Sequence, residues 1–298
     1  MATRAPEIDP APGRDSLLTA GVDVGTRSVR IAIFDHSYAH AHGQAPALGR
    51  GRGRVVATSV APVQGRRDTR DARQAIRDAW ASALRDGGIA ATDVANIAST
   101  GVRARAVVHV GHFYRGLGIA EGARHLYPRA VAVLDIGVAE VRCLRLGHVP
   151  EVERRTRLAV CRSGEMLEQL ARRSGLGLDE LALVPGALWI YDQLVERVTA
   201  MLRRLHVEGG AVLTGGMVLD ARFAAALRRR LAAELPSVEL LISPEGPFAG
   251  AYGAALLAAR RYRRIADVIG EREPAGEPVP GEAPLPAPRR RAERRGLN

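Results

Sequence analysis

The sequence contains no lysine, so its 43 fixed cations are all arginines. It has only two cysteines among 298 residues, which are too few for a disulfide framework. No apolar run approaches the roughly 20 residues of a membrane-spanning helix, and the first 15 residues lack the apolar core of a signal peptide. These absences predict a cytoplasmic protein with no membrane partner.

The net charge of +11 raises the question of nucleic-acid binding. The arginines, however, are scattered through the chain or gathered near its end, at residues 289–291 and 294–295. A nucleic-acid surface combines basic residues with aromatic residues that stack on bases, and no stretch of the sequence interleaves the two. We therefore interpret the arginines as ordinary surface residues and predict no nucleic-acid partner.

A predicted β-hairpin over residues 20–35 contains the first candidate site, because apolar residues alternate on both sides of the turn Gly25-Thr26-Arg27-Ser28. The turn offers backbone N–H groups, hydroxyls and one cation at short range, which suits a phosphate. Asp23, at the end of the first strand, could hold a hydrated Mg²⁺ against that phosphate. An ordinary hairpin with a solvent-facing carboxylate is the alternative, since Asp-x-Gly-Thr is a short pattern.

The rest of the chain predicts a mixed α/β protein. Alternating or continuous apolar residues predict further strands over 55–60, 94–99, 130–137, 140–146, 211–214 and 238–242. Helical spacing predicts helices over 68–87, part of 109–126, 163–174, 188–205, 220–234 and 250–265.

The strand pattern repeats in the second half of the chain. Residues 130–137 end in Asp135-Ile136-Gly137, and a second strand follows after a tight turn, with Asp135 in the place of Asp23. Such a repeat predicts two duplicated domains that face each other across a cleft, each contributing one aspartate to the same ligand. The predicted boundaries are a disordered leader over 1–16, domains over 17–127 and 128–265, and a disordered Pro/Arg-rich tail over 266–298.

Three signals stand in order along the chain: the turn at Asp23, the turn at Asp135, and Thr214-Gly215-Gly216. This order resembles the actin/Hsp70/sugar-kinase superfamily, whose members close two ribonuclease-H-like domains around ATP. The resemblance implies an α/β fold of duplicated ribonuclease-H-like domains around a central nucleotide cleft. It also implies that Gly215 and Gly216 pass under the adenosine, where a side chain would collide with it.

A narrower resemblance covers about residues 19–262. Its motifs are Ser99-Thr100-Gly101, Gly111-His112-Phe113-Tyr114, Asp135-Ile136-Gly137, Cys161-Arg162-Ser163-Gly164 and Gly246-Pro247-Phe248-Ala249-Gly250-Ala251. Together they resemble the ATPase family of benzoyl-CoA reductase subunits and 2-hydroxyacyl-CoA dehydratase activators. The second and fifth motifs look most like the D-type, ATP-binding branch of that family.

In that family, ATP hydrolysis drives a low-potential electron from a [4Fe-4S] cluster, shared between two ATPase subunits, to a partner that reduces an acyl-CoA. The resemblance therefore implies a homologous ATPase subunit, in a homo- or heterodimer, and an acyl-CoA reductase or dehydratase subunit as partners. The implied residue roles are Asp23 and Asp135 as catalytic Mg²⁺ ligands that orient the attacking water, Gly25, Thr26, Arg27 and Gly137 at the phosphates, Gly215 and Gly216 at the nucleoside, and Cys161 as a cluster ligand.

The sequence departs from the family at the cysteines. The loop that begins at Cys161 is short of a glycine, and the segment that carries the family's second cysteine is missing between residues 182 and 189. Cys143 belongs to a predicted strand, where a small buried thiol is the ordinary explanation. Because such a cluster needs four thiolates, we expect one here only if a different subunit supplies ligands.

Two other functions stay open. The missing cysteine segment favours a divergent, non-redox member that has lost the cluster and has a structural or regulatory role. A small-molecule kinase would need a carboxylate base beside the γ-phosphate, and the sequence offers no clear candidate beyond the two aspartates.

Overall fold

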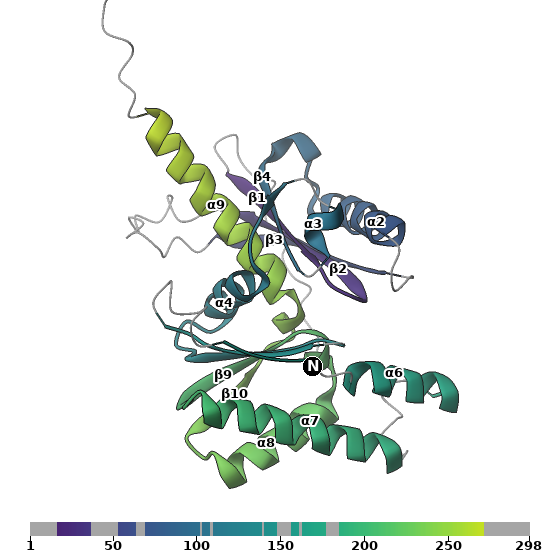
Figure 1. Ribbon diagram of the computed structural model, residues 1–298. Coiled ribbons are helices and arrows are strands. Elements are labelled where there is room, and N and C mark those ends of the chain that lie inside the picture. The colour runs from purple at the N-terminus through teal and green to yellow at the C-terminus, as the bar shows by residue number, and fades with distance from the viewer. Residues whose placement is uncertain are drawn as a thin grey trace, which may run out of the picture. The chain divides into compact units, whose positions relative to one another are not determined.

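The computed structural model describes residues 17–36, 53–63, 69–101, 103–107, 110–138, 140–147, 156–160, 163–176 and 185–270 (Figure 1). The predicted leader, most of the predicted tail and Cys161 lie outside these residues. The chain divides into two units, Met1–Tyr262 and Arg263–Asn298. Both sheets belong to the first unit. None of the described helices is long and apolar enough to cross a bilayer.

The first sheet has the strand order β3-β2-β1-β4-β5. Its strands are β1 (Leu18–Val24), β2 (Ser28–Asp35), β3 (Arg54–Pro62), β4 (Val94–Thr100) and β5 (Gly111–His112). β1 pairs with β2 antiparallel and with β4 parallel. Helix α2 (Thr69–Gly87) covers one face with a row of buried alanines, Ala72, Ala75, Ala79 and Ala83. Short elements η1 (Ala91–Asp93) and α3 (Ala104–Val107) flank β4.

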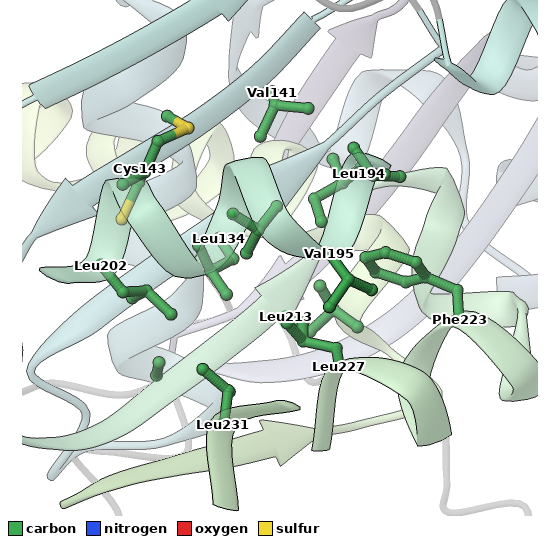
Figure 2. Packing of buried hydrophobic residues seen from close by; sticks show 14 of the residues in the cluster. Leu134, Val141, Cys143, Leu194, Val195, Leu202, Leu213, Phe223, Leu227 and Leu231 are labelled. Atoms are coloured by element: carbon green, nitrogen blue, oxygen red, sulfur yellow. The ribbon is translucent and has the colours of Figure 1, made fainter. Parts of the chain in front are cut away.

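The second sheet has the order β10-β9-β6-β7-β8. Its strands are β6 (Ala132–Ile136), β7 (Glu140–Arg145), β8 (Thr156–Val160), β9 (Gly209–Thr214) and β10 (Val238–Ile242). Helices α6 (Ser163–Ser174), α7 (Pro185–Arg204) and α8 (Ala221–Glu234) accompany it. Large side chains of α7 and α8, among them Leu194, Phe223 and Leu227, pack against Leu134 and Leu213 of the sheet (Figure 2).

The two sheets repeat one topology, because β6 to β10 stand in the same order as β1 to β5. The repeat extends to single residues. Asp23 pairs with Arg30 on β2 and Thr100 on β4, while Asp135 pairs with Arg142 on β7 and Thr214 on β9. The predicted duplicated α/β fold is therefore confirmed, and each aspartate lies near the end of a central strand.

Two helices connect the repeats. Helix α4 (Arg115–Leu126) follows β5, yet its Ile119, Ala120 and Ala123 pack on the second sheet. Helix α9 (Ala249–Gly270) follows β10, yet it packs against β1 at Gly21, where a Cβ would lie 2.5 Å from the backbone nitrogen of Ala255. The helices meet without side chains between them, since a Cβ on Gly118 would lie 3.4 Å from the carbonyl oxygen of Gly250.

Some elements differ from the sequence-based prediction. Strand β8 was not predicted, because five residues at a sheet edge give too little alternation to read. The stretch predicted as partly helical over 109–126 contains the two-residue β5 before α4 begins. Helix α7 begins at Pro185, where the fixed φ and missing N–H of proline suit a first helical turn. Short elements η3 (Gly216–Leu219) and η4 (Gly246–Phe248) follow the glycine turn and precede α9.

Candidate functional site

A cavity of about 310 Å³ lies where the two aspartate-bearing turns meet. The predicted site residues that line it are Asp23, Gly25, Thr26, Arg27, Asp135, Gly137, Gly215 and Gly216. The structure thus brings together every predicted site residue except Cys161, which lies outside the described residues. Residues that were not predicted also line the cavity, including Arg30, Arg115, Glu140, Thr214, Asp220 and Gly250.

The turns of the two repeats have the same backbone geometry. The N–H of Gly25 donates to the carbonyl of Ser28 at 3.0 Å, and the N–H of Gly137 donates to the carbonyl of Glu140 at 2.9 Å. These tight turns leave the tips of two hairpins at the cavity, so backbone and side-chain donors of Thr26 can face a ligand. Such clustered donors are suited to an anion.

Asp23 is almost completely buried, with 6% of its surface exposed. Its Oδ1 has no hydrogen-bond partner among the described residues. Burial raises the pKa of this carboxyl, although the nearby guanidinium groups of Arg115 and Arg30 oppose the shift. A buried, unsatisfied carboxylate oxygen beside a cavity is suited to a cation or a hydrogen-bond donor that a ligand would bring.

Asp135 has similar burial but a different environment. Arg115 donates from Nε to Asp135 Oδ2 at 3.0 Å, and its Nη2 lies 2.9 Å from the same oxygen. The hydroxyl of Thr214 donates to the carbonyl of Leu134 and lies 3.5 Å from Asp135 Oδ1. Asp135 raises the pKa of Arg115, so this guanidinium stays charged. One carboxylate therefore has a resident cation, and the other has an unsatisfied oxygen.

Sequence analysis missed Arg115, although one signal pointed to it. Arg115 is the first residue of α4, and a cation there opposes the positive end of the helix dipole. Such a placement requires a compensating anion nearby, and Asp135 supplies it. That pairing spans 20 residues of sequence, so it could not be assigned without the fold.

The glycine turn after β9 provides open space. Gly215 has φ +85°, and a Cβ there would lie 2.5 Å from the carbonyl oxygen of Ile136, so this position requires glycine. A Cβ on Gly216, in contrast, would meet nothing within 4 Å. Gly216 therefore leaves room on the cavity wall, as a passage for a nucleoside would need.

Asp220 has a structural part at the same wall. Its Oδ1 accepts from the backbone N–H groups of Arg222 at 3.1 Å and Phe223 at 2.9 Å, which caps α8. The hydroxyl of Tyr191 donates to Asp220 Oδ2 at 2.6 Å. These bonds fix the η3–α8 junction that follows the glycine turn.

The residues present suit Mg²⁺ at one aspartate. The free oxygen of Asp23 matches the one or two carboxylates with which Mg²⁺ is held beside phosphates, whereas Asp135 is engaged by Arg115. Among the described residues, no group of three or more His, Cys, Asp or Glu side chains could hold a metal on its own. Cys143 is fully buried in β7, and burial raises the pKa of its thiol to about 12.

Comparison with known proteins gives one sequence relative and several related folds. No family model matches the chain. It is 28% identical over 288 residues to the D-type subunit of the benzoyl-CoA reductase of Thauera aromatica, covering 84% of this chain and 95% of that protein.

Two solved structures are similar at lower identity. Component A of the (R)-2-hydroxyglutaryl-CoA dehydratase of Acidaminococcus fermentans is 20% identical, with a TM-score of 0.65 over 84% of this chain and 100% of that one. The activator of the 2-hydroxyisocaproyl-CoA dehydratase of Clostridium difficile, with bound ADPNP, is 16% identical, with a TM-score of 0.68 over 85% of this chain and 98% of that one. At these identities the likeness concerns the fold. The resemblance predicted from the motifs is confirmed: the chain is a relative of the D-type subunit of benzoyl-CoA reductase and has the fold of the actin-like ATPases.

Proposed function

We propose that this chain is the ATP-binding subunit of a benzoyl-CoA-reductase-like system, in which ATP hydrolysis drives low-potential electron transfer towards an acyl-CoA. The observation that carries the proposal is the shared cavity, lined by Asp23 and Asp135 from equivalent positions of the two repeats and by the open turn at Gly216. The relative among benzoyl-CoA reductase subunits supports the acyl-CoA system. The related activator with bound ADPNP supports the nucleotide.

The residues divide the nucleotide between them. The turns at Thr26 and Gly137 donate to the phosphates, Arg27 adds a cation, and Gly216 lies along the nucleoside. Asp23 would hold Mg²⁺, which supplies charge neutralisation at the phosphate oxygens. Asp135 is held in one orientation by Arg115 and would accept a hydrogen bond from the attacking water.

The proposal includes two protein partners. A homologous ATPase subunit, identical or different, would complete a dimer, and an acyl-CoA reductase or dehydratase subunit would receive the electron. The names of the relatives, a reductase subunit and two dehydratase components, support the second partner.

Nucleotide binding is tested by calorimetry with Mg²⁺ and ADPNP. We expect wild type to bind and Gly216→Val to lose binding by at least about tenfold, because the new side chain points into open space that the nucleoside would occupy. The matched control is Gly186→Val in the first turn of α7, where the Cβ makes an ordinary contact of 3.8 Å with Leu170. Equal binding by the two variants, or no binding by wild type, would contradict the proposal.

The missing cysteine segment supports a second candidate, an ATP-binding member without redox chemistry. Anaerobic reconstitution with iron and sulfide separates the two. The redox function predicts a brown protein, alone or with a partner subunit, whose colour is lost in Cys161→Ser and kept in Cys143→Ser. Colourless protein in both settings, with ADPNP binding intact, would favour the non-redox function.

A further inference from the structure

The guanidinium of Arg115 lies between the two halves of the candidate site. It contacts Asp135 through Nε and Nη2, and its charge also acts on Asp23. A Cβ built on Gly137 would lie 3.9 Å from Arg115 Nη2, so the guanidinium lies next to the second of the two anion-suited turns. Its side chain is 18% exposed, and Arg115 lines the cavity.

The two aspartates therefore differ in what they can still bind. Both Arg115 contacts end on Asp135 Oδ2, whereas Asp23 Oδ1 has no hydrogen-bond partner among the residues described. A divalent cation that approached Asp135 would meet a fixed positive charge 2.9 Å from the same oxygen. Like charges at such short range repel strongly in a partly buried site.

We propose that Arg115 is a resident cation of the nucleotide site: it occupies Asp135, confines any divalent cation to Asp23, and allows phosphates to bind without a metal ion. The inference rests on the proposed function, because it assumes that the cavity takes a nucleotide. It adds that binding by this chain depends less on Mg²⁺ than a site of two open carboxylates would.

The chemistry of the guanidinium supports this role. A guanidinium has five N–H donors in a planar fork, and the contacts with Asp135 use two of its nitrogens. The remaining donors suit phosphate oxygens, which arginine binds with matched geometry. Without Arg115, two buried carboxylates would face the phosphates, and a metal ion would be needed to offset their charge.

The experiment measures ADP affinity by calorimetry, once with Mg²⁺ and once with excess EDTA. We expect the dissociation constants of wild type in the two buffers to agree within about fivefold. In Arg115→Gln, we expect the EDTA value to weaken by at least about tenfold relative to wild type, while Mg²⁺ restores most of the affinity through the freed Asp135. The matched control is Arg230→Gln on α8, which removes an exposed arginine paired with Glu234 and keeps the wild-type ratio.

A second measurement follows Mn²⁺ binding without nucleotide, by electron paramagnetic resonance. Arg115→Gln should bind Mn²⁺ more tightly than wild type, because two carboxylates become open to it. Wild-type ADP binding that disappears in EDTA would overturn the inference even if no variant folds, and leaves the proposed function intact. Absence of ADP binding in both buffers would instead overturn the proposed function, and this inference with it.

Discussion

The two repeats share one strand order but cover their sheets with different side chains. In the first repeat, α2 lays four alanines on the sheet. In the second, α7 and α8 supply leucines, valines and a phenylalanine, all buried (Figure 2). Small side chains allow close approach of the helix, whereas large ones fill a thicker layer. The shared backbone topology therefore places the site, while the packing around it can diverge.

The same contrast appears at the site itself. Asp23 and Asp135 have equivalent strand partners, yet of the two it is Asp135 that has an ion pair with Arg115. Arg115 comes from α4, the helix that leaves the first repeat and packs on the second. The asymmetry therefore arises from the connection between the repeats.

The largest expected effect tests the packing contrast. Phe223→Ala should lower the free energy of unfolding by about 3–5 kcal/mol, because it removes a fully buried ring from the α8 layer. Ala79→Gly in α2 should cost only about 1 kcal/mol, the difference in helix propensity. Urea unfolding followed by circular dichroism measures both. Equal losses would mean that the two layers do not differ as described.

A smaller effect separates two equivalent positions on the central strands. Gly21 and Val133 each stand two residues before the aspartate. Gly21→Ala should cost about 2–3 kcal/mol, because the new methyl group meets the backbone of α9 at Ala251 and Ala255. Val133→Ala should cost about 1–2 kcal/mol for the opposite reason, a lost contact in a fully buried position.

These two positions can be distinguished by a second readout. Because α9 packs directly on Gly21, Gly21→Ala should shift that helix and raise its hydrogen exchange, whereas Val133→Ala should leave it protected. A Gly21→Ala variant as stable as wild type would contradict the close approach of α9 to β1.

The repeat and the two aspartate turns were predictable because they are local. Alternating residues around Asp23 and Asp135 and the glycines after each specify hairpins without reference to the rest of the chain. The motif order then indicated one cavity, and the structure places those residues around it. Their chemical roles stay predictions.

What could not be predicted depends on distant contacts. The Arg115–Asp135 pair and the approach of α9 to Gly21 join segments that periodicity treats separately. Strand β8 was missed because it is a five-residue edge strand whose pairing with β7, rather than its own pattern, defines it. Local patterns therefore predicted the elements, and contacts between the repeats determined the charges at the site.

A third comparison concerns the carboxylates and predicts effects of opposite sign. Asp135→Asn should cost about 1–2 kcal/mol, because it leaves the charge of Arg115 partly buried without its partner. Asp23→Asn should raise stability at neutral pH, since burial raises the pKa of Asp23 and the ionised group is costly.

The pH dependence of Asp23→Asn checks the sign. A raised folded-state pKa gives stability that is present below the ordinary pKa of 3.8 and is lost as pH rises through the folded-state pKa. The advantage of Asp23→Asn in thermal unfolding should therefore shrink as pH falls towards that ordinary value. An Asp23→Asn variant that is less stable than wild type at neutral pH would show that Asp23 is satisfied in the folded protein.

The smallest effect at neutral pH concerns Cys143, which occupies on β7 the register position that Ile31 has on β2. Cys143→Ala should cost about 1 kcal/mol near pH 7, as expected for a small buried hydrophobic side chain. Burial raises the pKa of the thiol from 9.0 to about 12, so the stability that it contributes is present below pH 9 and declines as pH rises towards 12. The free energy of unfolding of wild type should therefore fall relative to Cys143→Ala by about 1.4 kcal/mol per pH unit in that window. Ile31→Val is the matched control, because its difference from wild type has no titrating group and should stay constant with pH. A pH-independent difference for Cys143→Ala would mean that the thiol ionises as easily in the folded chain as in the unfolded one, and that the second sheet is less closed around β7 than the first is around β2.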